Sequence, residues 1–161
     1  MAARRIAVRV REGAPPGLFW LGGFKSDMKG TKAQALDQWA RDHGRAMTRL
    51  DYSGHGESEG DFIDGTIGRW LEESLAVFDA CCRGPQVVIG SSMGGWIALL
   101  LARELARRIG AFTFDGLPSA ATVCTWTSRR DASIPRSGGA VEVTRGGITT
   151  AMSGLRAAMV A

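Results

Sequence analysis

Apolar and polar positions along the chain alternate between the two periods that distinguish strands from helices. Ile6, Val8 and Val10 alternate with arginines, which predicts a half-exposed strand. Apolar residues at helical spacing predict two amphipathic helices further along. The expected order is a strand around residues 6–10, a strand at Leu18–Leu21, a helix at Thr31–His43, a strand at Ala46–Leu50, a helix from Thr66 to about Cys82, a strand at Gln86–Ile89, a helix at Met93–Arg108 and a strand at Ala111–Phe114. Such alternation predicts an α/β fold with a mostly parallel sheet, helices on both faces, and ligand chemistry at the carboxyl ends of the strands.

The pattern fades near residue 115, which divides the chain into residues 1–115 and an atypical tail, 116–161. The tail is mostly Ala, Gly, Ser, Thr and Arg and has no sustained period of 2 or 3.6. One explanation is an insertion or a weakly structured, disordered tail. The other is a break in the reading frame between Ile109 and Leu117, because a shifted frame of a GC-rich gene would give this composition.

Length, charge and cysteine content narrow the class of protein. The 161 residues suit one domain with a real core. The net charge of +4 comes mostly from scattered arginines, so no nucleic-acid partner is expected. Three cysteines give no disulfide framework and no metal spacing, so we expect a reducing, cytoplasmic location and no metal or cofactor. No apolar run reaches the roughly 18 residues of a membrane span.

The segment Gly90-Ser91-Ser92-Met93-Gly94 carries the clearest candidate chemistry. It fits the G-x-S-x-G pattern, with a β-branched strand before it and an apolar helix after it. That context is typical of a nucleophile elbow, in which a serine projects from a strained strand-to-helix turn. Alternatives are an ordinary glycine-rich βα loop or a phosphate cradle at a helix N-terminus. The segment lacks the lysine of a P-loop and the spacing of a dinucleotide fingerprint.

Three segments together resemble the successive signatures of α/β-hydrolases. They are Leu21-Gly-Gly-Phe-Lys-Ser-Asp-Met-Lys-Gly-Thr-Lys-Ala33, Asp51-Tyr-Ser-Gly-His-Gly-Glu-Ser58 and Gly90-Ser-Ser-Met-Gly-Gly95. The first two resemble in particular bacterial relatives of the mitochondrial abhydrolase-domain palmitoyl-protein thioesterase. The resemblance covers residues 5–108 and implies a partial α/β-hydrolase fold.

The resemblance also implies roles for individual residues. Ser92 would be the nucleophile that attacks a carboxylic ester or acyl thioester. The backbone N–H groups of Phe24 and Met93 would form the oxyanion hole. In the resembling family the loop of Asp51 and His55 has a structural role.

Other candidates have ordinary structural explanations. His43 ends a helix, where an imidazole complements the helix dipole. The large aromatic residues are expected to pack in the core. They are Trp39, Trp70, Phe78 and Trp96.

A catalytic base is missing from the sequence. The triad order of the fold is Ser, then an acid, then His, but His55 is the last histidine of the chain. Two functional classes therefore stay open: a serine hydrolase with a small acyl substrate, or an inactive truncated remnant or binding module. An incomplete sheet also exposes an edge near residues 111–114, so self-association is expected.

Overall fold

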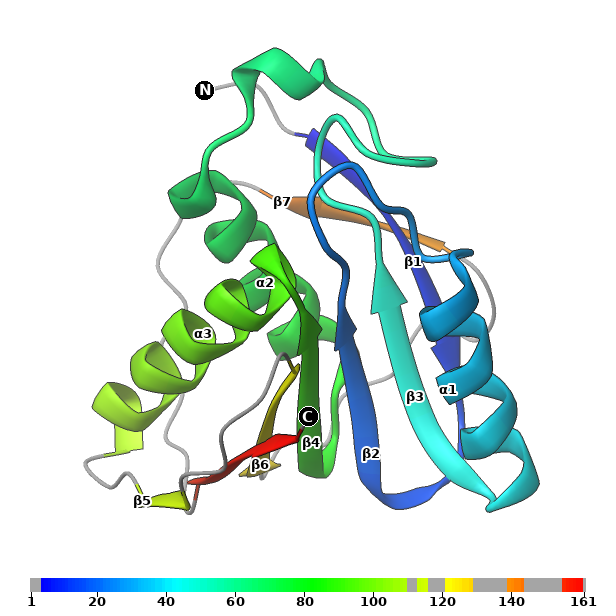
Figure 1. The fold of residues 1–161 in the computed structure, drawn as a ribbon, viewed down its shortest axis with the longest axis vertical. Helices are drawn as coiled ribbons and strands as arrows, with labels where there is room; N and C mark the ends of the chain where they lie inside the picture. Colours follow the sequence, from blue (N-terminus) through cyan, green and yellow to red (C-terminus); the bar gives the residue numbers. More distant parts are fainter. Residues whose placement is uncertain (1–3, 110–112, 116–120, 129–138, 144–154, 161) are drawn as a thin grey trace.

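The computed structural model describes residues 4–109, 113–115, 121–128, 139–143 and 155–160 (Figure 1). The elements are β1 (Arg4–Arg11), β2 (Ala14–Leu21), α1 (Thr31–Asp42), β3 (Arg45–Leu50), the short 3₁₀ helix η1 (Phe62–Asp64), α2 (Ile67–Cys81), β4 (Gly84–Ser91), α3 (Met93–Ile109), β5 (Thr113–Asp115), β6 (Ala121–Ser128), β7 (Gly139–Val143) and β8 (Leu155–Val160). The predicted strands and helices up to residue 109 are confirmed, with ends that differ by a few residues.

The described strands form one sheet in the order β5-β8-β6-β4-β2-β3-β1-β7. Its centre is parallel, because β2 pairs in parallel with both β3 and β4. β1 pairs antiparallel with β3, and β6 pairs antiparallel with β4. The expectation of a mostly parallel sheet is confirmed for β1 to β4, where two of the three pairings are parallel.

Alternating residues of β2 explain why helices cover both faces of the sheet. Leu18 and Trp20 pack in a cluster with Ala33 and Ala40 of α1. Phe19 and Leu21 point the other way, into the larger core that α2 and α3 close. Figure 1 accordingly shows α1 on one side of the strands and α2 and α3 on the other.

β2 begins earlier than the apolar run predicts. It starts at Ala14 and includes the exposed residues Pro15 and Pro16. Its pairing with β3 is irregular between Ala14 and Leu18. An irregularity of this kind accommodates proline, which has no backbone N–H to donate to a neighbouring strand.

The tail is described only in part. β5 overlaps the predicted strand at residues 111–114, and β5 and β7 are the two edge strands of the described sheet. Residues 116–120, 129–138 and 144–154 lie outside the described residues. The division at residue 115 and self-association through a sheet edge therefore stay predictions.

Candidate active site

Ser92 is the single residue that connects β4 to α3. Its φ angle is +53°, a left-handed value that costs a residue with a side chain on the order of 1–3 kcal/mol. Its side chain is exposed, while its carbonyl accepts hydrogen bonds from the amides of Gly95 (2.9 Å) and Trp96 (3.3 Å). The strand-to-helix turn that the sequence predicts is thus present, and the serine in it is an exposed residue.

The two glycines of the motif let three backbone segments meet. A Cβ on Gly90 would lie 2.2 Å from the carbonyl oxygen of Gly94, and one on Gly94 would lie 2.1 Å from that of Leu21. Real Cβ atoms essentially never approach backbone so closely. The G-x-S-x-G spacing therefore follows from the contact of α3 with the ends of β4 and β2.

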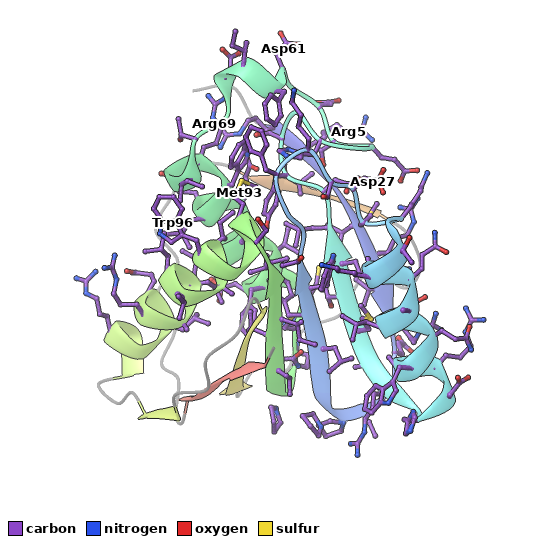
Figure 2. All side chains as sticks on the ribbon, viewed as in Figure 1. Arg5, Asp27, Asp61, Arg69, Met93 and Trp96 are labelled. Carbon is purple, nitrogen blue, oxygen red and sulfur yellow. The ribbon has the colours of Figure 1, made fainter. Side chains whose placement is uncertain are left out.

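The segment after β2 lies against the serine. A Cβ on Gly23 would lie 3.2 Å from the Ser91 carbonyl oxygen and 3.6 Å from the Ser92 Cβ. Within the described part of the chain, the backbone N–H groups of Phe24 and Met93 donate no hydrogen bond. Figure 2 shows Met93 where β4 ends and α3 begins. Within the described residues, both amides that the resemblance implies are thus without a hydrogen-bond acceptor, and a side chain on Gly23, the residue before Phe24, would contact the serine.

Asp51 and His55 lie in the glycine-rich loop after β3. The Asp51 carboxylate, 2% exposed, accepts hydrogen bonds from the backbone N–H of Met28 (2.6 Å) and of Glu57 (2.9 Å). Burial raises the pKa of Asp51, while these two hydrogen bonds act in the opposite direction. This carboxylate ties backbone segments together rather than facing the serine.

The His55 ring is enclosed by aromatic side chains. It makes edge-on contacts with Tyr52, Phe62 and Trp70 at centroid distances of 5.5, 5.1 and 5.1 Å. Its Nδ1 lies 3.3 Å from the carbonyl oxygen of Ser53. No hydrogen bond in the described residues joins its ring to Ser92, and its buried Nε2 has no partner there.

His43 lies at the end of α1, as the sequence indicates. Its Nδ1 is 2.8 Å from the carbonyl oxygen of Trp39, and its ring stacks on the Trp39 ring at 4.2 Å. Neither histidine of the chain therefore contacts the serine within the described residues.

The expected burial of the aromatic residues is only partly right. Trp70 and Phe78 are buried, but Trp39 is 45% exposed and Trp96 is 58% exposed. Packing was the wrong expectation for these two, because each lies on the solvent side of its helix (Figure 2 shows Trp96 projecting from α3). Helical spacing alone does not tell a tryptophan in the core from one that stacks on a neighbouring side chain.

The polar contacts of Lys32 and Glu73 were not anticipated from the sequence. Lys32 donates from Nζ to Ser91 Oγ at 3.3 Å, which places a cation beside the elbow. Glu73 is fully buried in α2 and accepts from Arg4 Nε (3.0 Å) and from the Ser53 backbone N–H (2.9 Å). A sequence signal existed for Glu73, since it stands at helical spacing on the apolar face of α2.

Comparison with known proteins identifies the fold. A sequence model of the alpha/beta hydrolase family matches residues 14–159. The chain belongs to the alpha/beta hydrolase family. This hydrolase-family chain is 37% identical over 116 residues to human mitochondrial palmitoyl-protein thioesterase ABHD10, an alignment that covers 72% of the chain and 37% of that relative. It thus spans less than two fifths of the length of the curated relatives it matches.

Solved structures agree with this assignment. Mouse alpha/beta hydrolase domain-containing protein 10 superposes with a TM-score of 0.63 at 33% identity, over 70% of this chain and 45% of that one. A crystal structure from Agrobacterium vitis S4 superposes with a TM-score of 0.60 at 51% identity, over 65% of this chain and 41% of that one. The partial α/β-hydrolase fold expected from the sequence is confirmed.

Two structural features are absent from the described residues. Among the described residues, no three His, Cys, Asp or Glu side chains gather in a way that could hold a metal ion. In the same part of the chain, no helix has the length and apolar character needed to cross a membrane.

Proposed function

We propose that this chain is a serine hydrolase that cleaves carboxylic esters or acyl thioesters through an acyl-enzyme on Ser92. The observation that carries the proposal is the exposed Ser92 at φ +53°, between a strand and a helix and next to two amides that donate no hydrogen bond in the described fold. A hydroxyl in such a turn is accessible to a carbonyl carbon, and adjacent free N–H groups suit the developing oxyanion.

The proposed reaction has two stages, acylation of Ser92 and hydrolysis of the acyl-enzyme. Ser92 Oγ forms a bond to the acyl carbon and loses its proton to solvent water, while the carbonyl oxygen becomes an oxyanion facing the N–H groups of Phe24 and Met93. When the oxyanion collapses, the bond to the alcohol or thiol breaks and that group leaves with a proton. Water then cleaves the acyl-Ser92 ester by the same steps. A small acyl ester or thioester is the partner this requires, and thioesters fit the name of the palmitoyl-protein thioesterase relatives.

A second candidate is a remnant without activity, or a binding module. It is favoured by the absence of any histidine after His55 and of contacts from His43 or His55 to Ser92 in the described residues. An oxyanion hole and substrate binding without a triad leave about 10³–10⁴-fold acceleration over water. The first candidate therefore predicts slow chemistry and the second predicts none.

A reducing, cytoplasmic compartment completes the proposal. Cys81 and Cys82 are free and buried, and burial raises the pKa of Cys81 to about 11. Thiols in this state neither form nor need a disulfide.

A fluorophosphonate probe separates the two candidates. We expect slow labelling of the folded protein and loss of labelling in Ser92→Ala. Ser91→Ala is the matched control, because it removes the hydroxyl of the neighbouring serine, and its labelling should be unchanged. Intact mass spectrometry measures the adduct. Folded protein that stays unlabelled over long incubation would identify the remnant, and equal labelling of Ser92→Ala would place the reaction elsewhere.

A further inference from the structure

The segment from Gly22 to Met28 carries the Phe24 amide and is held at both ends by consecutive residues after β3. The Tyr52 hydroxyl donates to the carbonyl oxygen of Gly22 at 3.2 Å. The Met28 N–H donates to Asp51 Oδ1 at 2.6 Å, and the Met28 carbonyl accepts from Arg49 Nη1 at 3.0 Å. Both backbone groups of Met28 thus have side-chain partners.

The groups that hold the segment are themselves fixed. Tyr52 and Met28 are each 1% exposed and Asp51 is 2% exposed. The second oxygen of Asp51 accepts from the Glu57 N–H at 2.9 Å, and Arg49 also bonds Asp37 at 3.2 Å. Burial raises the pKa of Tyr52, so its hydroxyl remains a donor at neutral pH.

Between its ends the segment makes a tight turn of its own. The Ser26 N–H donates to the Gly23 carbonyl at 3.1 Å, and Lys25 has a left-handed φ of +54°. The Phe24 side chain is 58% exposed and meets the Phe62 ring edge-on at 4.9 Å. Little packing therefore holds Phe24 itself, and its backbone depends on the two fixed ends.

We propose that Tyr52 and Asp51 are positioning residues that hold the peptide planes around Phe24 so that its N–H faces Ser92. This inference rests on the proposed function of the serine. Oxyanion donors are effective when they are in place before the charge develops, since no reorganisation is then needed. The glycine-rich loop after β3 thereby acts on the chemistry through the segment after β2, without touching the substrate.

The test uses Tyr52→Phe, which removes one hydroxyl and keeps the ring. The matched control is Ser74→Ala, which also removes a buried hydroxyl, one that donates to the Trp70 carbonyl at 2.7 Å within α2. Two quantities are measured in the full chain: the rate of fluorophosphonate labelling at Ser92, and the NMR order parameter of the ¹⁵N-labelled Phe24 amide, assigned with Phe24→Leu. Labelling forms the Ser92 Oγ–P bond, breaks the P–F bond and releases fluoride and the hydroxyl proton.

We expect labelling to slow about tenfold in Tyr52→Phe and the Phe24 order parameter to fall from the rigid range near 0.85. Ser74→Ala should change neither quantity. Asp51→Ala should behave like Tyr52→Phe, and Asp51→Asn should lie between it and the parent, because the amide oxygen still accepts from Met28.

Three results distinguish the possible failures. A Phe24 amide that stays rigid in both Tyr52→Phe and Asp51→Ala would overturn the proposal. A lower Phe24 order parameter with an unchanged rate of Ser92 labelling would also overturn it. If the parent protein is not labelled at all, the proposed function fails, and the order parameters alone then decide whether these residues fix the segment.

Discussion

Gly94 shows at the scale of one residue how tightly the elbow is packed. A methyl group there would meet the carbonyl oxygens of Leu21 and Gly22 at 2.1 and 2.5 Å, so Gly94→Ala must push α3 away from β2. We expect a loss of about 1–3 kcal/mol in the free energy of unfolding, measured in urea, together with loss of Ser92 labelling.

Gly68→Ala is the control for this prediction. Gly68 also lies near the beginning of a helix, but a Cβ there meets nothing within 4 Å. Its substitution should leave stability unchanged or raise it by up to about 1 kcal/mol. Equal stability of the two variants would contradict the argument from close approach.

Residues that form a recognisable local motif were predictable from the sequence, and residues without such a motif that act through distant partners were not. Gly90, Ser92 and Gly94 form one turn, so their spacing alone indicates the elbow. Nothing in the spacing indicates that Tyr52 would reach the Gly22 carbonyl 30 positions earlier in the chain. Such a contact arises only when β2 and β3 pair side by side.

At the scale of elements, Asp37 links α1 to the sheet through hydrogen bonds. Its carboxylate accepts two hydrogen bonds from Arg11 of β1, at 2.9 and 2.8 Å, and one from Arg49 of β3 at 3.2 Å. Hydrogen bonding from Arg11, with the charge of Arg49, lowers the pKa of Asp37 although burial opposes this. Because the pKa of Asp37 is lower in the folded state, its ion pairs stabilise the fold at pH values above the unfolded-state pKa, near 3.9. This stabilisation is lost as the pH falls through the folded-state pKa.

Asp37→Asn should therefore lower the free energy of unfolding at pH 7 by about 2 kcal/mol, and the difference from the parent should shrink in acid below the unfolded pKa. Denaturant titrations at neutral and acidic pH measure both. The control is Glu59→Gln, which removes an exposed pair with Arg5 at 3.6 Å and should cost less than about 1 kcal/mol. A difference that persists unchanged into acid would show that the Asp37 charge contributes nothing.

The first residues of α2 and β2 show which element boundaries the sequence can predict. α2 begins where the sequence places it, because Thr66 caps the helix by accepting from the Arg69 N–H at 3.1 Å. β2 begins four residues before its apolar run, because pairing with the neighbouring strands rather than side-chain pattern sets where a strand starts. Local capping chemistry is visible in a sequence, whereas pairing to a distant strand is not.

At the scale of the whole molecule, the order of the serine and the histidines along the given sequence is the decisive feature of the proposed chemistry. The fold supplies the strained serine and two amides that donate no hydrogen bond within the described residues, yet the sequence has no histidine after His55. A serine hydroxyl is a weak nucleophile without a base within reach. The rate of acylation should then be limited by proton removal rather than by the binding of substrate or by the oxyanion hole.

Added imidazole should supply this base. The exposed Ser92 side chain leaves room for a small neutral imidazole to accept the hydroxyl proton. A positioned base contributes about 10²–10⁴-fold, so a diffusing one should raise the rate of Ser92 acylation several-fold or more. The rise should be proportional to the concentration of neutral imidazole and should therefore fade at low pH, where imidazole is protonated.

Imidazole also hydrolyses activated esters directly, and the rate measured with Ser92→Ala gives this background reaction. Equal dependence on imidazole in the parent and in Ser92→Ala would mean that the serine takes no part, and would leave the inactive remnant as the better description of this chain.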